Sequence, residues 1–220
     1  MMDFEQAIKA RYSCRKFQDR KVPRATIEKI LEVSQHTASW NNVQPWRVLI
    51  ASGEAARKFS DALVAHVEAG GKPNPDFAFP TDYQGIERER RKTCGLQLYQ
   101  AVRITRDDEV AKRNQMLENF RLFGAQHVAL ITAPAYLGFY AALDCGLYVN
   151  NFMLAAKSLG IDTIAQAAIA HYSDFVREYF SIGDDRKLVC GVSFGFEAKE
   201  HPINQYRTER ATIDDVVTWR

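Results

Sequence analysis

The stretch SWNNVQPWRVLI, residues 39–50, joins a cluster of amide and indole side chains to an apolar run. The apolar run is rich in residues that favour strands, so we predict a strand over residues 46–52. Amides and indoles are costly to bury without partners. The core of such a strand explains Trp46. It does not explain Asn42 and Gln44, whose polar groups beside aromatic faces suit a flat heteroaromatic ligand.

Helical and strand-like patterns alternate on both sides of this stretch. The expected helices begin near Asp3 and cover residues 24–38, 53–70, 85–104 and 140–161, and the other expected strands cover 127–132 and 187–197. The segment 140–161 is apolar nearly all round, which indicates a place in the core or in a dimer interface. With no repeat and no clear linker, the sequence predicts one α+β domain over residues 1–220.

Composition excludes several classes of protein. The net charge of +2 and the pI near 8.3 are too mild to indicate a nucleic-acid or membrane partner. No apolar run reaches the roughly 18 residues of a membrane span. The four cysteines are far apart, which fits reduced thiols in the cytoplasm, and the five histidines are too scattered for a metal site. We therefore expect a cytoplasmic protein without a metal.

Familiar catalytic and phosphate-binding motifs are absent from the sequence. There is no G-x-G-x-x-G after a strand and no G-x-x-x-x-G-K-[ST]. Ser193 lies between glycines, but within a strand pattern and not at a strand-turn-helix elbow. If the chain is an enzyme, a cofactor is expected to supply the reactive group.

Two basic segments could bind an anion. In RYSCRKF, residues 11–17, Arg11 and Arg15 are four residues apart with the hydroxyl of Ser13 between them. In NQYRTER, residues 204–210, two further arginines are three residues apart. Guanidinium forks suit phosphate oxygens, but each segment alone is more typical of a solvated surface.

These segments together resemble the FMN-dependent nitroreductase family, and their order most resembles its nitrobenzoate-reductase-like branch. The first two resemble its R-x-S-x-R-x-F and S-x-x-N-x-Q-P-W segments, and the others resemble later family segments in the right order. The matching stretches are residues 11–17, 38–50, 118–132, 144–172, 190–196 and 204–210. The resemblance implies a nitroreductase-like α+β fold with a central, mostly antiparallel sheet flanked by helices. It also implies an intertwined homodimer.

The resemblance further implies that FMN is bound between the subunits. It places the phosphate at both basic segments, residues 39–44 of the partner against the flavin, and the segment from Ala165 to Ala168 near flavin N5. The implied cofactor-binding residues are Arg11, Tyr12, Ser13, Arg15, Ser39, Trp40, Asn41, Asn42, Gln44, Asn119, Arg121, Ala165, Gln166, Ala167, Ala168, Arg207 and Arg210. Tyr99 and Phe77 are expected on the substrate side, the latter in a proline-rich loop over residues 72–83 that could cover the site.

The chain departs from the family pattern at two places. Ile164-Ala165-Gln166 replaces the family's Cys-Pro-Gln, and Gln126 replaces the Pro that follows F-x-A. The first change removes a residue that fixes φ, so it bears on the geometry near N5 and on substrate preference. Neither change removes an implied phosphate ligand.

The implied activity is an FMN-dependent NAD(P)H oxidoreductase with ping-pong kinetics. NAD(P)H would pass hydride to N5 and leave, and a small aromatic substrate, such as a nitroaromatic, or a quinone would then be reduced. No catalytic side chain is required. The alternatives are another flavin reaction on the same scaffold, such as reductive dehalogenation or flavin turnover, a non-catalytic FMN-binding protein, or a dimeric scaffold.

Overall fold

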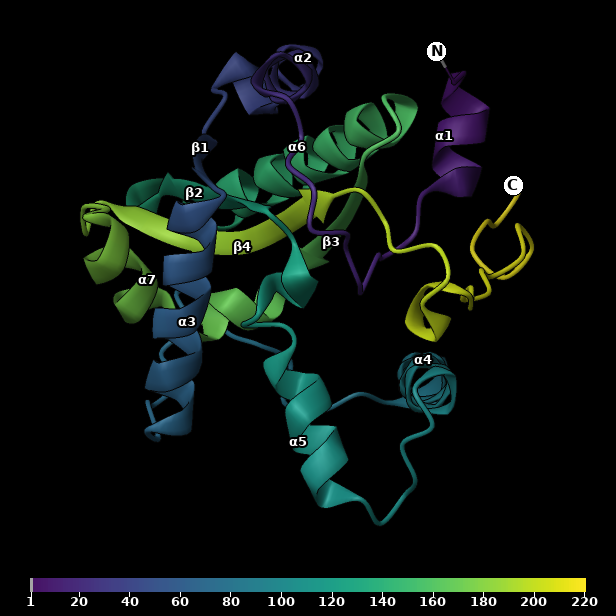
Figure 1. The fold of residues 1–220 in the computed structure, drawn as a ribbon. Helices are drawn as coiled ribbons and strands as arrows, with labels where there is room; N and C mark the ends of the chain where they lie inside the picture. Colours follow the sequence, from purple (N-terminus) through teal and green to yellow (C-terminus); the bar gives the residue numbers. More distant parts are fainter. Residues whose placement is uncertain (1) are drawn as a thin grey trace.

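The structure is a computed structural model that describes residues 2–220. Its centre is a four-stranded sheet with the order β1-β2-β4-β3, in which each neighbouring pair is antiparallel (Figure 1). The strands are β1 (Arg47–Ser52), β2 (His127–Pro134), β3 (Asp162–Gln166) and β4 (Arg186–Gly195). The predicted α+β class, with an antiparallel sheet flanked by helices, is confirmed.

Helices surround the sheet and connect its strands. They are α1 (Phe4–Ala10), α2 (Arg24–Ser34), α3 (Glu54–Glu68), α4 (Gly85–Ala101), α5 (Glu109–Leu117), α6 (Gly138–Ser158) and α7 (Ser173–Phe180). Short 3-10 segments are η1 (Trp40–Asn42), η2 (Leu122–Gly124), η3 (Ala135–Leu137), η4 (Ala167–Tyr172) and η5 (Pro202–Asn204). Over residues 2–220, no helix combines the length and the apolar character that crossing a bilayer requires.

The two faces of the sheet carry separate hydrophobic clusters. Val128 and Leu130 of β2 belong to one cluster, and Ala129 and Ile131 belong to the other, because successive side chains of a strand point to opposite faces. Helix α6 covers the second face. Trp46 is buried there against Tyr148, with ring centroids 5.0 Å apart, so the predicted core role of Trp46 is confirmed.

The first half of α6 also presents large apolar side chains to solvent. Phe139, Tyr140, Leu143 and Leu147 are between 46% and 74% exposed. The core therefore accounts for one face of this helix, whereas the other face is uncovered in a single chain. An uncovered apolar face of this kind is typical of a protein–protein contact.

Three elements were not expected from the sequence: β3, α5 and α7. Strand β3 is only five residues long and begins and ends with polar residues, so it lacks a β-forming run. It is stable because it pairs with β4 from Asp162 to Gln166 and completes the sheet. Tertiary pairing, rather than local propensity, specifies this strand.

The proline-rich segment, residues 71–83, is fixed to the body of the protein. Asp76 accepts a hydrogen bond from the backbone N–H of Leu188 at 2.7 Å and pairs with Arg177 of α7. The ring of Phe79 stacks on His171 with centroids 3.9 Å apart. The expected cover over the site thus packs, in this chain, against α7 and the beginning of β4.

Candidate active site

The N-terminal basic segment lies along β3, at one edge of the sheet. Ser13 forms a parallel bridge with Thr163 of β3, and the N–H of Cys14 donates to the Thr163 carbonyl at 3.0 Å. The buried side chain of Asn204 then ties this segment to the C-terminal one. Its Oδ1 accepts from the N–H of Arg15 at 2.9 Å, and its Nδ2 donates to the carbonyl of Lys16 at 2.8 Å.

The end of α1, the two basic segments and α4 enclose a cavity of about 430 Å³, here called the arginine pocket. Residues from near both ends of the chain meet there, and Figure 1 shows α1 and the C-terminal segment on the same side of the molecule. Its lining residues are Ile8, Lys9, Arg11, Tyr12, Ser13, Arg15, Cys94, Tyr206, Arg207, Thr208 and Arg210. Five of these are cationic and none is a carboxylate. Lys9 pairs with Glu5, so it is the four arginines that suit the pocket to an anion.

Carbonyl oxygens orient three of the guanidiniums without neutralising them. The Nη1 group of Arg15 donates to the Ser13 carbonyl at 3.2 Å, that of Arg207 donates to Asn204 at 2.7 Å, and that of Arg210 donates to Thr208 at 3.1 Å. Within residues 2–220, none of these three is ion-paired with a carboxylate. Their charge is therefore available to a ligand.

Like charges act on one another in the pocket. Burial, and then the nearby Arg210, lower the pKa of Arg11. The guanidinium of Arg207 lies over the ring of Tyr12, with 3.6 Å between Cζ and the centroid. Burial and a hydrogen bond from the Tyr12 hydroxyl to Glu197 raise the pKa of Tyr12. A bound dianion would relieve the repulsion between the arginines, and the donor set fits a phosphate group.

The amide-rich stretch forms a strained, solvent-facing turn, here called the amide turn (residues 39–44). Asn41, Asn42 and Gln44 all have positive φ, at 46°, 55° and 49°. The turn is braced internally, because Ser39 Oγ accepts from the N–H of Gln44 at 2.9 Å and Gln44 Nε2 donates to Asn42 Oδ1 at 3.1 Å. The side chain of Trp40 is 59% exposed. These amides are therefore not buried within the chain.

The arginine pocket and the amide turn lie near opposite ends of α6. The N–H of Trp40 is 3.2 Å from both carboxylate oxygens of Asp144, near the start of the helix. The ring of Tyr12, in contrast, lies 5.7 Å from Nζ of Lys157, near its end. Because an α-helix rises 1.5 Å per residue, these two positions are about 20 Å apart. One chain does not bring the two regions into the same site.

The end of β3 exposes small side chains. Ala165 and Ala167 are exposed, whereas Gln166 between them is only 2% exposed. Its Nε2 donates to the carbonyl of Asn119 at 2.6 Å, and its Oε1 accepts from the hydroxyl of Ser193. Gln166 thus holds neighbouring segments together, and the small side chains on either side of it stay exposed. Ala168, next along the chain, is partly buried against the core.

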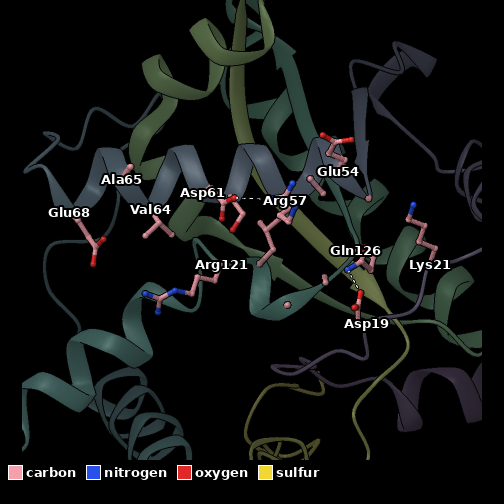
Figure 2. A pocket seen from close by; sticks show the side chains of 16 residues that line it. Asp19, Lys21, Glu54, Arg57, Asp61, Val64, Ala65, Glu68, Arg121 and Gln126 are labelled. Carbon is pink, nitrogen blue, oxygen red and sulfur yellow. Dashed lines mark hydrogen bonds and ion pairs between the residues drawn. The ribbon is translucent and has the colours of Figure 1, made fainter.

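Arg121 lies in a different cavity, which has a volume of about 780 Å³ and runs along α3 (Figure 2). Arg121 pairs there with Glu118, three residues earlier, at 3.1 Å. Gln126, at the family's Pro position, also lines this cavity and donates to Asp19 at 2.7 Å. The cavity mixes both signs of charge, because Asp19, Glu54, Asp61 and Glu68 face Lys21, Arg57 and Arg121. It is larger than the arginine pocket but lacks its selectivity for an anion.

The two residues expected on the substrate side, Tyr99 and Phe77, lie in different parts of this chain. Tyr99 is partly buried on α4, a helix without buried residues that packs mainly on η5. Phe77 lies in the proline-rich segment, where Nζ of Lys187 is 5.5 Å from its ring. No described contact links the two aromatic rings.

Several residues of the arginine pocket were not expected from the sequence. Lys9 and Tyr206 lie within two residues of predicted arginines, so proximity in the sequence could have indicated them. Cys94 comes from α4, and no spacing in the sequence connects it with the basic segments. Asp144, which holds the amide turn, looks like one polar residue in an apolar helix.

Comparison with known proteins identifies the class to which this fold and site belong. The model of the Nitroreductase family matches residues 8–196, which include the whole sheet and the N-terminal basic segment. The chain therefore belongs to the nitroreductase family.

Individual relatives align along nearly the whole chain. Nitroreductase NfnB of Mycolicibacterium smegmatis is 35% identical over 213 residues, which cover 96% of this chain and 90% of the relative. A 4-nitrobenzoate reductase of Nocardioides sp. is 30% identical over 220 residues, covering 98% and 89%. The crystal structure of an FMN and NADPH-dependent nitroreductase NfnB from Sphigopyxis sp. strain HMH has a TM-score of 0.96 and 30% identity, covering 100% and 99%. The resemblance seen in the sequence is confirmed.

Proposed function

We propose that the chain is an FMN-dependent NAD(P)H oxidoreductase that reduces nitroaromatics, quinones or similar flat acceptors. The observation that carries this proposal is the arginine pocket, with five cations and no carboxylate on a nitroreductase fold. The names of the relatives support it, since one is a 4-nitrobenzoate reductase and another is described as FMN and NADPH-dependent.

The chain's own groups would bind and orient the cofactor. Arg11, Arg15, Arg207 and Arg210, with the hydroxyl of Ser13, would hold the FMN phosphate. The exposed edge at Ala165 and Ala167 would admit the ring, and the Asn119 segment, held by Gln166, would border it. When bound, FMN supplies a centre that accepts and releases hydride. Ile164 is buried in the core, so of the residues that replace the family's Cys-Pro, only Ala165 changes the exposed edge.

The amide turn would serve the cofactor of a second subunit. Within one chain it is about 20 Å from the arginine pocket along α6, whereas its neighbours on that helix form the exposed apolar face described above. A homodimer that buries this face would carry each amide turn toward the partner's pocket. We further propose that residues 1–220 form one FMN-binding domain and that the protein works in the cytoplasm, where its four free cysteines would stay reduced.

Absorption and turnover of the purified protein test this proposal. After incubation with FMN and removal of free cofactor, the protein should show the yellow bands of a bound flavin. It should then oxidise many equivalents of NADPH or NADH when 4-nitrobenzoate or a quinone is present in excess. A colourless protein contradicts flavin binding. A yellow protein that oxidises neither nucleotide with any acceptor indicates a non-catalytic flavin protein.

A further inference from the structure

Two polar side chains of α6 hold the segment that leads into the amide turn. The carboxylate of Asp144 accepts from the N–H of Trp40, and Asn151 Nδ2 donates to Thr37 Oγ1 at 2.8 Å. Asp144 and Asn151 are seven residues apart and so lie on one face of the helix, about 10 Å from each other. Three residues of extended chain span the same distance. The segment from Thr37 to Trp40 is therefore laid straight along α6.

The exit of the amide turn is also fixed. Nη2 of Arg186 donates to the carbonyl of Pro45 at 3.0 Å and to that of Thr132 at 2.8 Å, which ties the turn to β2. The three residues with positive φ lie between Trp40, which Asp144 holds, and Pro45, which Arg186 holds. Asn adopts such a conformation more readily than most residues, but Gln44 keeps it only where the surrounding structure imposes it.

Asp144 is an unusual residue for this place. It is only 5% exposed, and within residues 2–220 no Lys, Arg or His forms an ion pair with it. Burying a carboxylate without a cation is costly, so a structural role alone would be met better by a neutral side chain. Its contact with the N–H of Trp40 is a charge-assisted hydrogen bond at the first residue of η1.

We propose that Asp144 is a positioning residue for the cofactor site. It holds the Trp40 amide and thereby presets the amides of Asn42 and Gln44 in the conformation that meets the flavin of the partner subunit. Asp144 itself touches no cofactor. This inference rests on the proposed function for its ligand, but the clamp on the turn is a property of the chain alone.

The clamp is tested first without cofactor, by hydrogen–deuterium exchange over residues 40–44. Asp144→Ala should exchange these amides about tenfold faster than the wild type, because a hydrogen bond to a charged group is lost. Asn151→Ala is the matched control, since it removes a bond from the same helix to the same segment but outside the turn. Wild-type exchange in Asp144→Ala, or equal acceleration in both variants, would overturn the clamp.

The positioning role is tested by FMN titration of the same proteins. Asp144→Ala should bind FMN about tenfold more weakly, whereas Asp144→Asn, which keeps an acceptor oxygen, should lie between it and the wild type. Asn151→Ala should lower the melting temperature and weaken FMN binding less than Asp144→Ala does, because its bond to Thr37 lies outside the turn. Wild-type affinity in Asp144→Ala with faster exchange would overturn the role. If Asp144→Ala does not fold, Asp144→Asn is decisive, and wild-type values for both measurements overturn the proposal. A wild type that binds no FMN would refute the proposed function instead.

Discussion

The arginine pocket and the amide turn are both rich in hydrogen-bonding groups, but the chain builds them in opposite ways. The pocket is assembled from distant segments, residues 8–15 and 206–210, with α4 closing one side. The turn is a single local stretch held in a strained conformation by α6 and β4. The pocket therefore needs the whole fold, whereas the conformation of the turn needs only the two elements that hold it.

Removing charge from the pocket should have the largest effect. We expect the double variant Arg11→Ala with Arg15→Ala to bind FMN at least about 100-fold more weakly, because each charge-assisted hydrogen bond to phosphate contributes about 1.5–3 kcal/mol. Fluorescence titration of FMN measures this. The control is Arg24→Ala with Arg57→Ala, which removes two exposed, ion-paired arginines and should bind like the wild type. Equal affinity of both double variants would remove the pocket from the site.

Acid should lower the stability of the protein through His127, which holds the chain at Val22. The buried ring of His127 accepts from the N–H of Val22 at 2.9 Å through Nε2, and its Nδ1 lies 2.8 Å from Ser52 Oγ. Burial, and then the charge of Lys21, lower the pKa of His127 to about 4. The unfolded chain, with a histidine pKa near 6.5, binds the proton first as pH falls. The contribution of neutral His127 to the free energy of unfolding is therefore fully present above about pH 6.5. It is lost as the pH falls from 6.5 to 4, and the loss is about 2 kcal/mol at pH 5.

Urea unfolding at pH 7 and pH 5 measures this loss. His127→Gln cannot titrate, so it should show a smaller difference between the two pH values even if it is less stable at both. The same difference in His127→Gln as in the wild type would assign the acid sensitivity to other groups.

Removing the amides of the turn should have a smaller effect than removing the arginines. Asn42→Ala with Gln44→Ala loses neutral hydrogen bonds, which contribute about 0.5–1.5 kcal/mol each, so we expect FMN affinity to fall about tenfold. The exposed Gln35 accepts from the indole of Trp46 but lies outside the turn, and Gln35→Ala is the control. An unchanged affinity in the double amide variant would leave the turn without a ligand.

Mixing the two double variants should restore part of the binding. Neither homodimer has a complete site, but a mixed dimer has one pocket and one turn intact. If the turn serves the partner's pocket, these meet in one site, and statistical mixing recovers about a quarter of the wild-type sites. FMN bound after co-refolding measures this recovery. If pocket and turn served the same chain, every site in the mixed dimer would be damaged and nothing would be recovered.

The sequence predicted the local parts of this site better than the distant ones. Arg11, Arg15, Arg207 and Arg210 could be proposed because each pair has a spacing that suits an anion and because both segments resemble family segments, and the structure places all four around one cavity. Trp46 is buried in the core as expected, whereas the ligand contact of the exposed Asn42 stays a prediction. These features depend on short-range patterns.

Features that depend on tertiary contacts could not be predicted. The strand β3 is defined by its pairing with β4. The contact of Arg121 with the flavin stays a prediction, and in this chain Arg121 pairs with the nearby Glu118 at the α3 cavity. The proline-rich loop has the composition of a mobile cover, but Asp76 and Phe79 anchor it. For β3 and for the loop, the partner that fixes the position is distant in the sequence.

The arginine pocket draws on Arg11 near the beginning of the chain and on Arg210 some two hundred residues later. During synthesis the first arginine leaves the ribosome early, whereas the last follows only after every strand of the sheet has been made. A nascent chain therefore has half of an anion site for most of its synthesis. If the pocket holds the FMN phosphate as proposed, the cofactor would load only after both ends of the chain have reached the pocket.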